Sequence, residues 1–188
     1  MASTPSIKVF GLCGSLRRGS LNAAALRAAR ELAPPGMEIG IFEGLREIPP
    51  YDDDLRQQGY PPPVQALRDA IKSADAVLIA TPEYNYSVPG VLKNAIDWAS
   101  RPPEQPFDGK PVAIMGASPG AIGTARAQYH LRQSFVFLNA FVLNRPEVMI
   151  GQATSRFDAE GRLTDEKTRD FVQSMLVALK DWTERLRR

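Results

Sequence analysis

The loop of residues 14–22 holds the residue types best suited to chemistry near the start of the chain. It contains two glycines, two serines and two arginines, and an alanine-rich stretch of helical composition follows over residues 20–32. Backbone N–H groups at a helix start suit a phosphate because the helix dipole is positive there, and hydroxyl and guanidinium groups add donors. The loop therefore indicates an anion site, although a tight turn with Ser20 as the helix cap fits the same residues.

Two common nucleotide-binding loops differ from this one. A P-loop needs lysine and then serine or threonine after its second glycine, whereas serine and leucine follow Gly19. A dinucleotide loop reads Gly-x-Gly-x-x-Gly, and the spacing of Gly11 and Gly14 does not fit it. An acidic residue at the end of the second strand can hold an adenosine ribose, so Glu43 leaves a dinucleotide-binding dehydrogenase open as an alternative.

A second candidate segment, residues 81–90, combines tyrosines and prolines with amide and carboxylate groups. Tyr84 and Tyr86 alternate with polar residues, and Pro89 stands where a helix would begin. A stiff aromatic wall with polar edges suits a planar ring that carries hydrogen-bonding groups. A surface loop with an aromatic residue packed beneath it is the alternative.

Apolar runs and helical stretches alternate along the chain and would position these loops. The predicted strands are Ile7–Cys13, Met37–Phe42, residues 74–80, Pro111–Ala117 and one strand within residues 140–150. The predicted helices cover residues 20–32, 64–73, 88–100, about 123–137 and about 164–187, the last with Thr164 as N-cap. This alternation predicts an α/β fold with a parallel sheet covered on both faces. Its ligands should bind beyond the carboxyl ends of strands one, three and four.

Length and composition predict one globular domain over residues 1–188. The chain is 44% apolar and 23% charged with a formal net charge of +2, and its basic residues are scattered. Because nucleic-acid binding needs a concentrated phosphate footprint, no nucleic-acid partner is expected. One cysteine, no apolar run of about 20 residues and no export signal at the start predict a cytoplasmic protein without a membrane partner. Cys13 and the single His130 show no signature of a nucleophile pair or a metal site.

Three sequence motifs follow one another within residues 7–147. They are GSLR at 14–17 with Ser20 and Asn22, PEYNYSVPG at 82–90 running into LKNAIDW at 92–98, and RAQYHLR at 126–132. In type and order they resemble the NADPH-dependent FMN reductase family of bacterial quinone and chromate reductases. The second motif is long and highly specific, and the other two are weaker alone.

The resemblance implies a flavodoxin-like three-layer sandwich with a five-stranded parallel sheet in the order 2-1-3-4-5. It also implies bound FMN, with one group of residues at the phosphate and ribityl chain, a second at the isoalloxazine and a third at its far edge. The group at the phosphate and ribityl chain is Ser15, Arg17, Ser20, Leu21 and Asn22. The group at the isoalloxazine is Pro82, Glu83, Tyr84 and Asn85, and the group at its far edge is Ser118 and Gly120. One departure is Thr124, which follows Gly123 where the family more often has two glycines, and which would add a side chain near the ring.

The activity that the resemblance implies is transfer of electrons from NADPH or NADH to small acceptors such as quinones, chromate, azo compounds or free flavin. Because a flavin carries the redox chemistry, no catalytic side chain is required, and a ping-pong cycle is expected. A flavodoxin-type electron carrier and an NAD-binding dehydrogenase are the alternatives. Such carriers are usually strongly acidic, whereas this chain has a pI of about 8.8, which favours the reductase.

Some residues have a functional and a structural interpretation. The resemblance implies a homodimer or homotetramer, with Arg126, Tyr129 and Glu147 as candidates for an inter-subunit contact. Trp98 suits either the core or a dimer face. The proline-rich stretch of residues 48–64 either forms one wall of the acceptor pocket or is a stiff surface connection.

Overall fold

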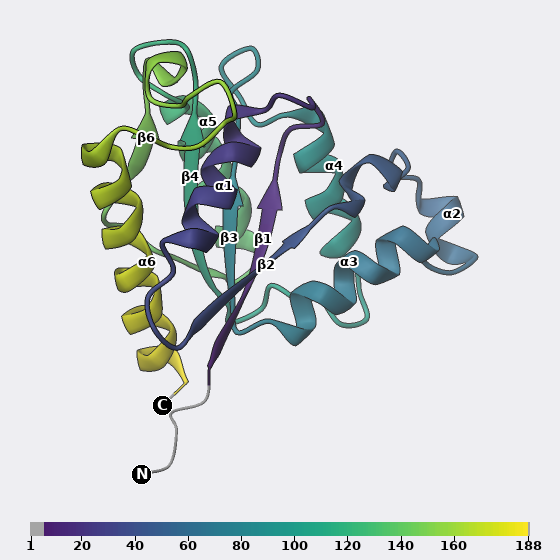
Figure 1. The fold of residues 1–188 in the computed structure, drawn as a ribbon. Helices are drawn as coiled ribbons and strands as arrows, with labels where there is room; N and C mark the ends of the chain where they lie inside the picture. The colour runs from purple at the N-terminus through teal and green to yellow at the C-terminus, as the bar shows by residue number, and fades with distance from the viewer. Residues whose placement is uncertain (1–5, 188) are drawn as a thin grey trace.

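A computed structural model describes residues 6–187 as a parallel sheet between two layers of helices (Figure 1). The strands are β1 (Ile7–Cys13), β2 (Met37–Phe42), β3 (Ala76–Ala80), β4 (Pro111–Ala117), β5 (Phe141–Val142) and β6 (Val148–Ile150). The sheet order is β2-β1-β3-β4-β5, and β6 also pairs with β4. The predicted α/β class and the flavodoxin-like strand order 2-1-3-4-5 are therefore confirmed.

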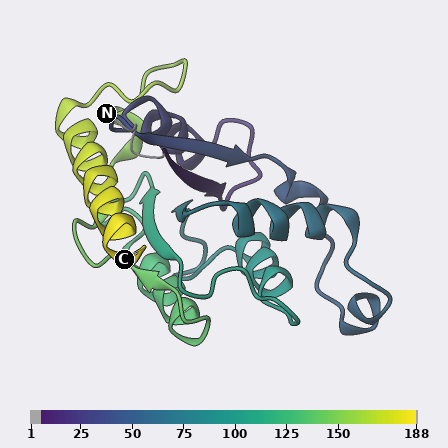
Figure 2. The ribbon, with the colours of Figure 1, turned by 90° about the horizontal axis from the view of Figure 1, so that it is seen from below.

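The helices cover both faces of the sheet. They are α1 (Leu21–Glu31), α2 (Asp53–Gln57), α3 (Pro62–Ser73), α4 (Gly90–Ala99), α5 (Ala125–Phe137) and α6 (Glu166–Leu186), with short 3₁₀ turns η1 (Gly44–Glu47) and η2 (Ala153–Ser155). Helices α1 and α6 pack on one face, and α3, α4 and α5 on the other (Figure 2). Neighbouring side chains of β1 enter opposite cores, Val9 on the α1 side and Phe10 on the α3 side. This two-sided burial explains why the strands are apolar almost throughout.

The carboxyl-terminal elements differ from the predicted ones in two ways. The fifth strand is split into β5 and β6, both parallel to β4, and Pro146 between them has no N–H with which to continue a ladder. Helix α6 begins later than predicted, and Thr164 as its N-cap is wrong. The carboxylate of Asp165 accepts the Thr168 N–H at 2.9 Å, whereas the Thr164 hydroxyl donates to the carbonyl of Arg156.

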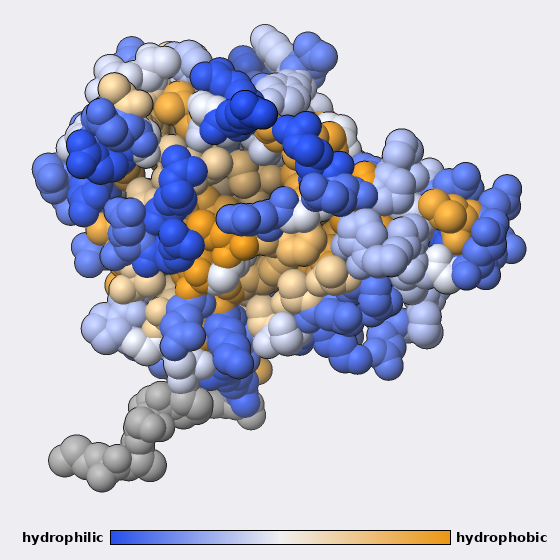
Figure 3. All heavy atoms as spheres, turned by 45° about the vertical axis from the view of Figure 1, so that its right-hand side comes forward, coloured by the Kyte–Doolittle hydropathy of each residue, from blue (hydrophilic) through white to orange (hydrophobic). Residues whose placement is uncertain are grey.

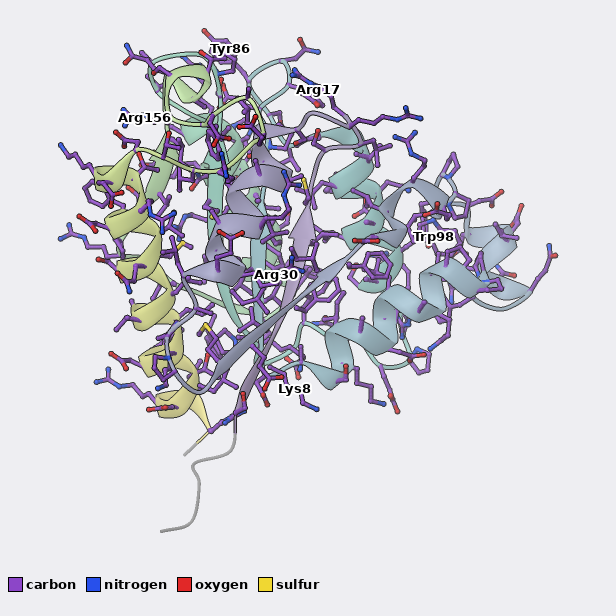
Figure 4. The ribbon with its side chains drawn as sticks, in the orientation of Figure 1. Lys8, Arg17, Arg30, Tyr86, Trp98 and Arg156 are labelled. Carbon is purple, nitrogen blue, oxygen red and sulfur yellow. The ribbon has the colours of Figure 1, made fainter. Side chains whose placement is uncertain are left out.

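The proline-rich connection of residues 48–64 contains helix α2 and packs on α4. The fully buried Trp98 donates its indole N–H to the Pro49 carbonyl at 2.8 Å, and its ring lies 4.9 Å from that of Tyr51. The Tyr60 hydroxyl donates to the Pro102 carbonyl at 2.7 Å. Figure 4 shows Trp98 on the side of the molecule that carries α3 and α4. These contacts make Trp98 a core residue and favour the structural interpretation of the connection.

The outer strand β2 leaves one side of the sheet partly open. A hollow of about 360 Å³ lies between β2 and α3, and Figure 3 shows apolar residues at the centre of this side with hydrophilic residues around them. Its lining includes Lys8 at the amino end of β1 and Ala74 before β3. This hollow therefore lies along the sheet edge, away from the strand ends where ligands of such sheets bind.

Residues 1–5 and 188 lie outside the described part of the chain, which leaves most of the segment examined for an export signal undescribed. Among residues 6–187, no helix is both long enough and apolar enough to cross a membrane.

Candidate cofactor site

The loop between β1 and α1 presents the open start of a helix. The Ser20 hydroxyl accepts the Ala23 N–H at 3.2 Å, and the Ser20 carbonyl accepts the Ala24 N–H at 3.0 Å. Within residues 6–187, no acceptor takes the N–H groups of Leu21 or Asn22, as expected for the first positions of a helix. Ser20 is thus a helix cap, as the turn interpretation had it, and the loop still offers two backbone donors to an anion.

Asn22 joins this loop to the end of β4. Its buried side-chain amide donates to the Ala117 carbonyl at 2.9 Å, and its carbonyl oxygen accepts the Ala117 N–H at 2.8 Å. The side chain of Asn22 therefore holds the start of α1 to the end of β4, and its backbone N–H is the group that remains free for a ligand.

The segment of residues 81–90 after β3, which we call the tyrosine loop, contains a tight two-residue turn. Tyr84 and Ser87 exchange backbone hydrogen bonds of 3.0 and 3.1 Å. Asn85 and Tyr86 between them have φ of 49° and 66°, a left-handed conformation that is unusual for tyrosine. Tyr86 is 65% exposed, with the Arg126 guanidinium 3.7 Å from its ring centroid. Figure 4 shows Tyr86 at the same end of the molecule as Arg17, above the carboxyl ends of the strands.

Glu83 anchors the tyrosine loop to the start of α5. Its carboxylate accepts the N–H groups of Arg126 at 3.0 Å and Ala127 at 3.1 Å, and the Arg126 guanidinium at 3.1 Å. The residue at the N-cap position of α5, Thr124, forms no side-chain cap bond, so Glu83 supplies the cap from another segment. A carboxylate suits this place because the helix dipole is positive there.

These elements enclose one hollow of about 160 Å³ at the carboxyl ends of β1, β3 and β4. Nine of the predicted residues line it: Ser15, Arg17, Ser20, Leu21, Asn22, Pro82, Glu83, Tyr84 and Ser118. Asn85 and Gly120 lie outside the lining, and the Gly120 N–H donates to the Ser118 hydroxyl at 3.2 Å. The structure thus brings together most of the residues that the sequence motifs indicated.

Three lining residues were not predicted: Ala117, Pro119 and Thr154. The first two lie next to the predicted Ser118. Thr154 comes from the loop after β6, which pairs with the carboxyl half of β4. The rule that ligands bind beyond strand ends, applied to the last strand as well, would have indicated that loop.

Thr124 points into the core, so the expectation that its side chain lies near the ring is wrong. It is fully buried, and its hydroxyl accepts the Gln128 side-chain N–H at 3.1 Å. A Cβ at Gly116 would overlap the Thr124 hydroxyl, so the glycine on β4 makes room for the threonine. Thr124 is also absent from the lining of the hollow.

Cys13 and His130 do not form a pair. The Cys13 sulfur lies 3.7 Å from the Ser15 carbonyl, and burial raises the pKa of its thiol. Nδ1 of His130 lies 3.1 Å from the Ser87 hydroxyl instead. A thiol with a raised pKa is a poor nucleophile at neutral pH, which supports the packing role expected from the sequence.

The parallel sheet and its strand order define a flavodoxin-like α/β protein, and a donor-rich hollow lies at the strand ends. Residues 7–155 match the model of the NADPH-dependent FMN reductase family. The chain belongs to that family.

Individual relatives match over nearly their whole length. The chain is 60% identical to an NAD(P)H-dependent FMN reductase of Pseudomonas aeruginosa, covering 96% of this chain and 97% of the relative. It is 48% identical to a quinone reductase of Escherichia coli, with the same two coverages. A solved structure of a flavoenzyme NAD(P)H:(acceptor) oxidoreductase from Paracoccus denitrificans superposes with a TM-score of 0.86 at 40% identity, covering 95% of this chain and 98% of that one.

Proposed function

We propose that the chain is an FMN-dependent NAD(P)H oxidoreductase that reduces quinones and other small acceptors. The names of its relatives favour this activity over an electron carrier or a dehydrogenase. The observation that carries the proposal is the single hollow that joins the open start of α1 to the tyrosine loop. A phosphate and a planar ring, the two ends of FMN, need these two kinds of surface at one site.

The donors at one end of the hollow fit the FMN phosphate. The N–H groups of Leu21 and Asn22 lie at the positive end of α1, next to the hydroxyls of Ser15 and Ser20. Arg17 adds a charged donor on the same lining. This combination of backbone, hydroxyl and guanidinium donors suits a phosphate dianion better than a neutral ligand.

The other end fits the isoalloxazine. Pro82 and Tyr84 after β3 and Ser118 and Pro119 after β4 line the hollow, which gives rigid walls with polar edges. When bound, FMN supplies the redox chemistry. Because the Tyr84 N–H is used within the turn, the backbone donors of residues 82–86 that have no acceptor among residues 6–187 are the N–H groups of Glu83, Asn85 and Tyr86. Tyr84 is 51% exposed, so NAD(P)H and the acceptor can reach the same side in turn, as a ping-pong cycle requires.

Two measurements on the purified protein test this function. We expect a yellow protein with a flavin absorption spectrum that reduces a quinone with NADPH and no partner reductase, with parallel lines in double-reciprocal plots. Activity that needs a partner reductase would indicate an electron carrier. A colourless protein that stays colourless after addition of FMN would indicate a dehydrogenase, and intersecting lines would exclude the ping-pong scheme.

Arg17→Ala should weaken FMN binding by about 1.5–3 kcal/mol, the contribution of a hydrogen bond to a charged group. Arg17 is exposed and its guanidinium lies over Gly19, so the substitution leaves no buried partner behind. Fluorescence titration of the apoprotein with FMN measures the change. Arg18→Ala is the matched control, because Arg18 is exposed and absent from the lining of the hollow. Equal FMN affinities of Arg17→Ala and Arg18→Ala would show that Arg17 does not contact the FMN phosphate.

We also propose that the chain forms a homodimer or homotetramer. Val136 and Phe137 at the end of α5 are 80% and 86% exposed, and Phe141 is 41% exposed. Apolar side chains gathered on a surface commonly mark contacts between proteins. The Tyr129 hydroxyl lies 3.4 Å from the Glu147 carboxylate within the chain, and we propose that both residues also contact a neighbouring subunit. Sedimentation velocity would contradict the proposal by showing only a monomer.

A further inference from the structure

A second hollow lies beside the loop between β1 and α1, which we call the phosphate loop. Its volume is about 280 Å³, and Ser15 and Arg17 line both this hollow and the cofactor hollow at the strand ends. All of its lining residues lie within residues 13–46, so none comes from the loops after β3 and β4 that form the ring end of the cofactor hollow. The two hollows therefore meet where the FMN phosphate is expected, and not at the ring.

Four arginines line the second hollow, which we call the arginine groove: Arg17, Arg27, Arg30 and Arg46. They come from the phosphate loop, α1 and the 3₁₀ turn η1, and Figure 4 shows Arg17 at the loop and Arg30 lower along α1. Within residues 6–187, no carboxylate lies within 4.0 Å of any of the four guanidinium groups. The groove therefore gathers cations that have no ion-pair partner in the described part of the chain.

The groove combines this positive charge with an apolar lining. Leu26 and Leu45 are buried and Ile41 is half-buried, and all three line the groove. Glu43 is the one carboxylate in the lining, against four cations, whereas the whole chain has a formal net charge of only +2. A concave surface of one charge sign attracts a ligand of the opposite sign, and a guanidinium also stacks on flat aromatic rings. The groove therefore suits a phosphorylated molecule that carries a flat ring.

The position of the groove specifies that molecule further. A separate anionic ligand would compete with FMN, because the FMN phosphate is expected beside Ser15 and Arg17, which the groove also uses. A group joined covalently to that phosphate meets no such conflict, since it continues from the phosphate into the groove. The volume of the groove is somewhat smaller than that of a typical site for a whole ligand, which suits one half of a larger molecule.

We propose that the protein binds FAD as well as FMN, with the FMN half of FAD in the cofactor hollow and its adenylate half in the arginine groove. This inference rests on the proposed function, because the flavin half uses the same site. Arg46 donates to the Leu16 carbonyl and is thereby held at the phosphate loop, where it would join Arg17 at the second phosphate. The adenine would lie against the apolar lining, and Glu43 can accept a hydrogen bond from a ribose hydroxyl.

The charges of the two cofactors make their relative affinities informative. The phosphate of FMN is a monoester with a charge of about −2 at neutral pH. In FAD the same phosphate is part of a pyrophosphate, so it carries less negative charge. The positive end of α1 alone therefore favours FMN. An affinity for FAD that equals or exceeds the affinity for FMN requires favourable contacts of the adenylate half.

Titration calorimetry of the full-length apoprotein with FMN and with FAD tests the proposal by binding alone. We expect FAD to bind at least as tightly as FMN. Arg27→Ala and Arg30→Ala should each weaken FAD binding about tenfold and FMN binding by no more than about twofold, because these arginines line the groove alone. Both side chains are exposed, so neither substitution leaves a buried group unpaired. Arg18→Ala removes the same charge outside both linings and should change neither affinity more than about twofold.

Three results would overturn the proposal. The first is FAD binding that is about tenfold or more weaker than FMN binding, and the second is an unchanged FAD affinity in both Arg27→Ala and Arg30→Ala. The third is an equal loss of FMN and FAD affinity in these variants, which would mean that the arginines act on the FMN phosphate through their charge alone. An apoprotein that binds FMN but not FAD would overturn this proposal and leave the proposed function standing, whereas an apoprotein that binds neither flavin would contradict the proposed function itself.

Discussion

Asn22→Leu is expected to lower the free energy of unfolding by about 2–5 kcal/mol, because it leaves two buried backbone groups without partners. The Asn22 side chain bonds both the N–H and the carbonyl of Ala117, at 2.8 and 2.9 Å, in a buried environment. Leucine has the same side-chain branching and is not smaller, so little of the loss would come from a cavity. Urea denaturation followed by circular dichroism measures the change.

The same substitution should also weaken FMN binding, since Asn22 fixes the phosphate loop relative to the end of β4, next to Ser118 on the ring side. The matched control is Gln65→Ala. Gln65 is an exposed amide whose side chain, among residues 6–187, bonds only Asp69 on the same helix, so about 0.5 kcal/mol or less is expected. A stability loss in Asn22→Leu no larger than in Gln65→Ala would show that the link to Ala117 contributes little.

The strand pattern predicted the sheet well, because buried parallel strands are apolar over their full length. Strands β1, β2 and β4 have the predicted bounds, and β3 differs only at its start. Residues 144–147 (Asn-Arg-Pro-Glu) interrupt the apolar residues of 140–150, but the split was missed because pairing with β4 on both sides of Pro146 is a tertiary feature. Local pattern thus predicts which segments form strands better than how an edge strand is interrupted.

The roles of the site residues were harder to predict than their positions. The motifs indicated Asn22 and Glu83 but not their partners. The Asn22 side chain bonds Ala117, which lies 95 residues further along the chain. The Glu83 side chain bonds Arg126 at the start of α5, 43 residues further along. Thr124 turns into the core because Gly116, on another element, leaves space there. No local pattern records such partners, so a motif names the residues of a site before it says which contact the ligand and which hold the loops.

Glu83→Ala should lower the free energy of unfolding by about 1–3 kcal/mol, the range for a helix cap combined with charge-assisted hydrogen bonds. Its carboxylate is the side-chain acceptor for the Arg126 and Ala127 N–H groups at the start of α5, and only 11% of the side chain is exposed. FMN affinity should fall as well, because Glu83 holds the segment that carries Tyr84 on the wall of the hollow. Urea denaturation and FMN titration measure the two effects.

Arg126→Ala separates the helix cap from the ion pair. This variant removes the guanidinium, which is 3.1 Å from Glu83 and 3.7 Å from the Tyr86 ring centroid, but keeps the two backbone hydrogen bonds. Because the Arg126 side chain is 41% exposed, solvent weakens the ion pair, and a loss of about 1 kcal/mol or less is expected. Glu83→Ala should therefore destabilise the protein more than Arg126→Ala. Equal losses would mean that the ion pair, and not the cap of α5, holds the tyrosine loop in place.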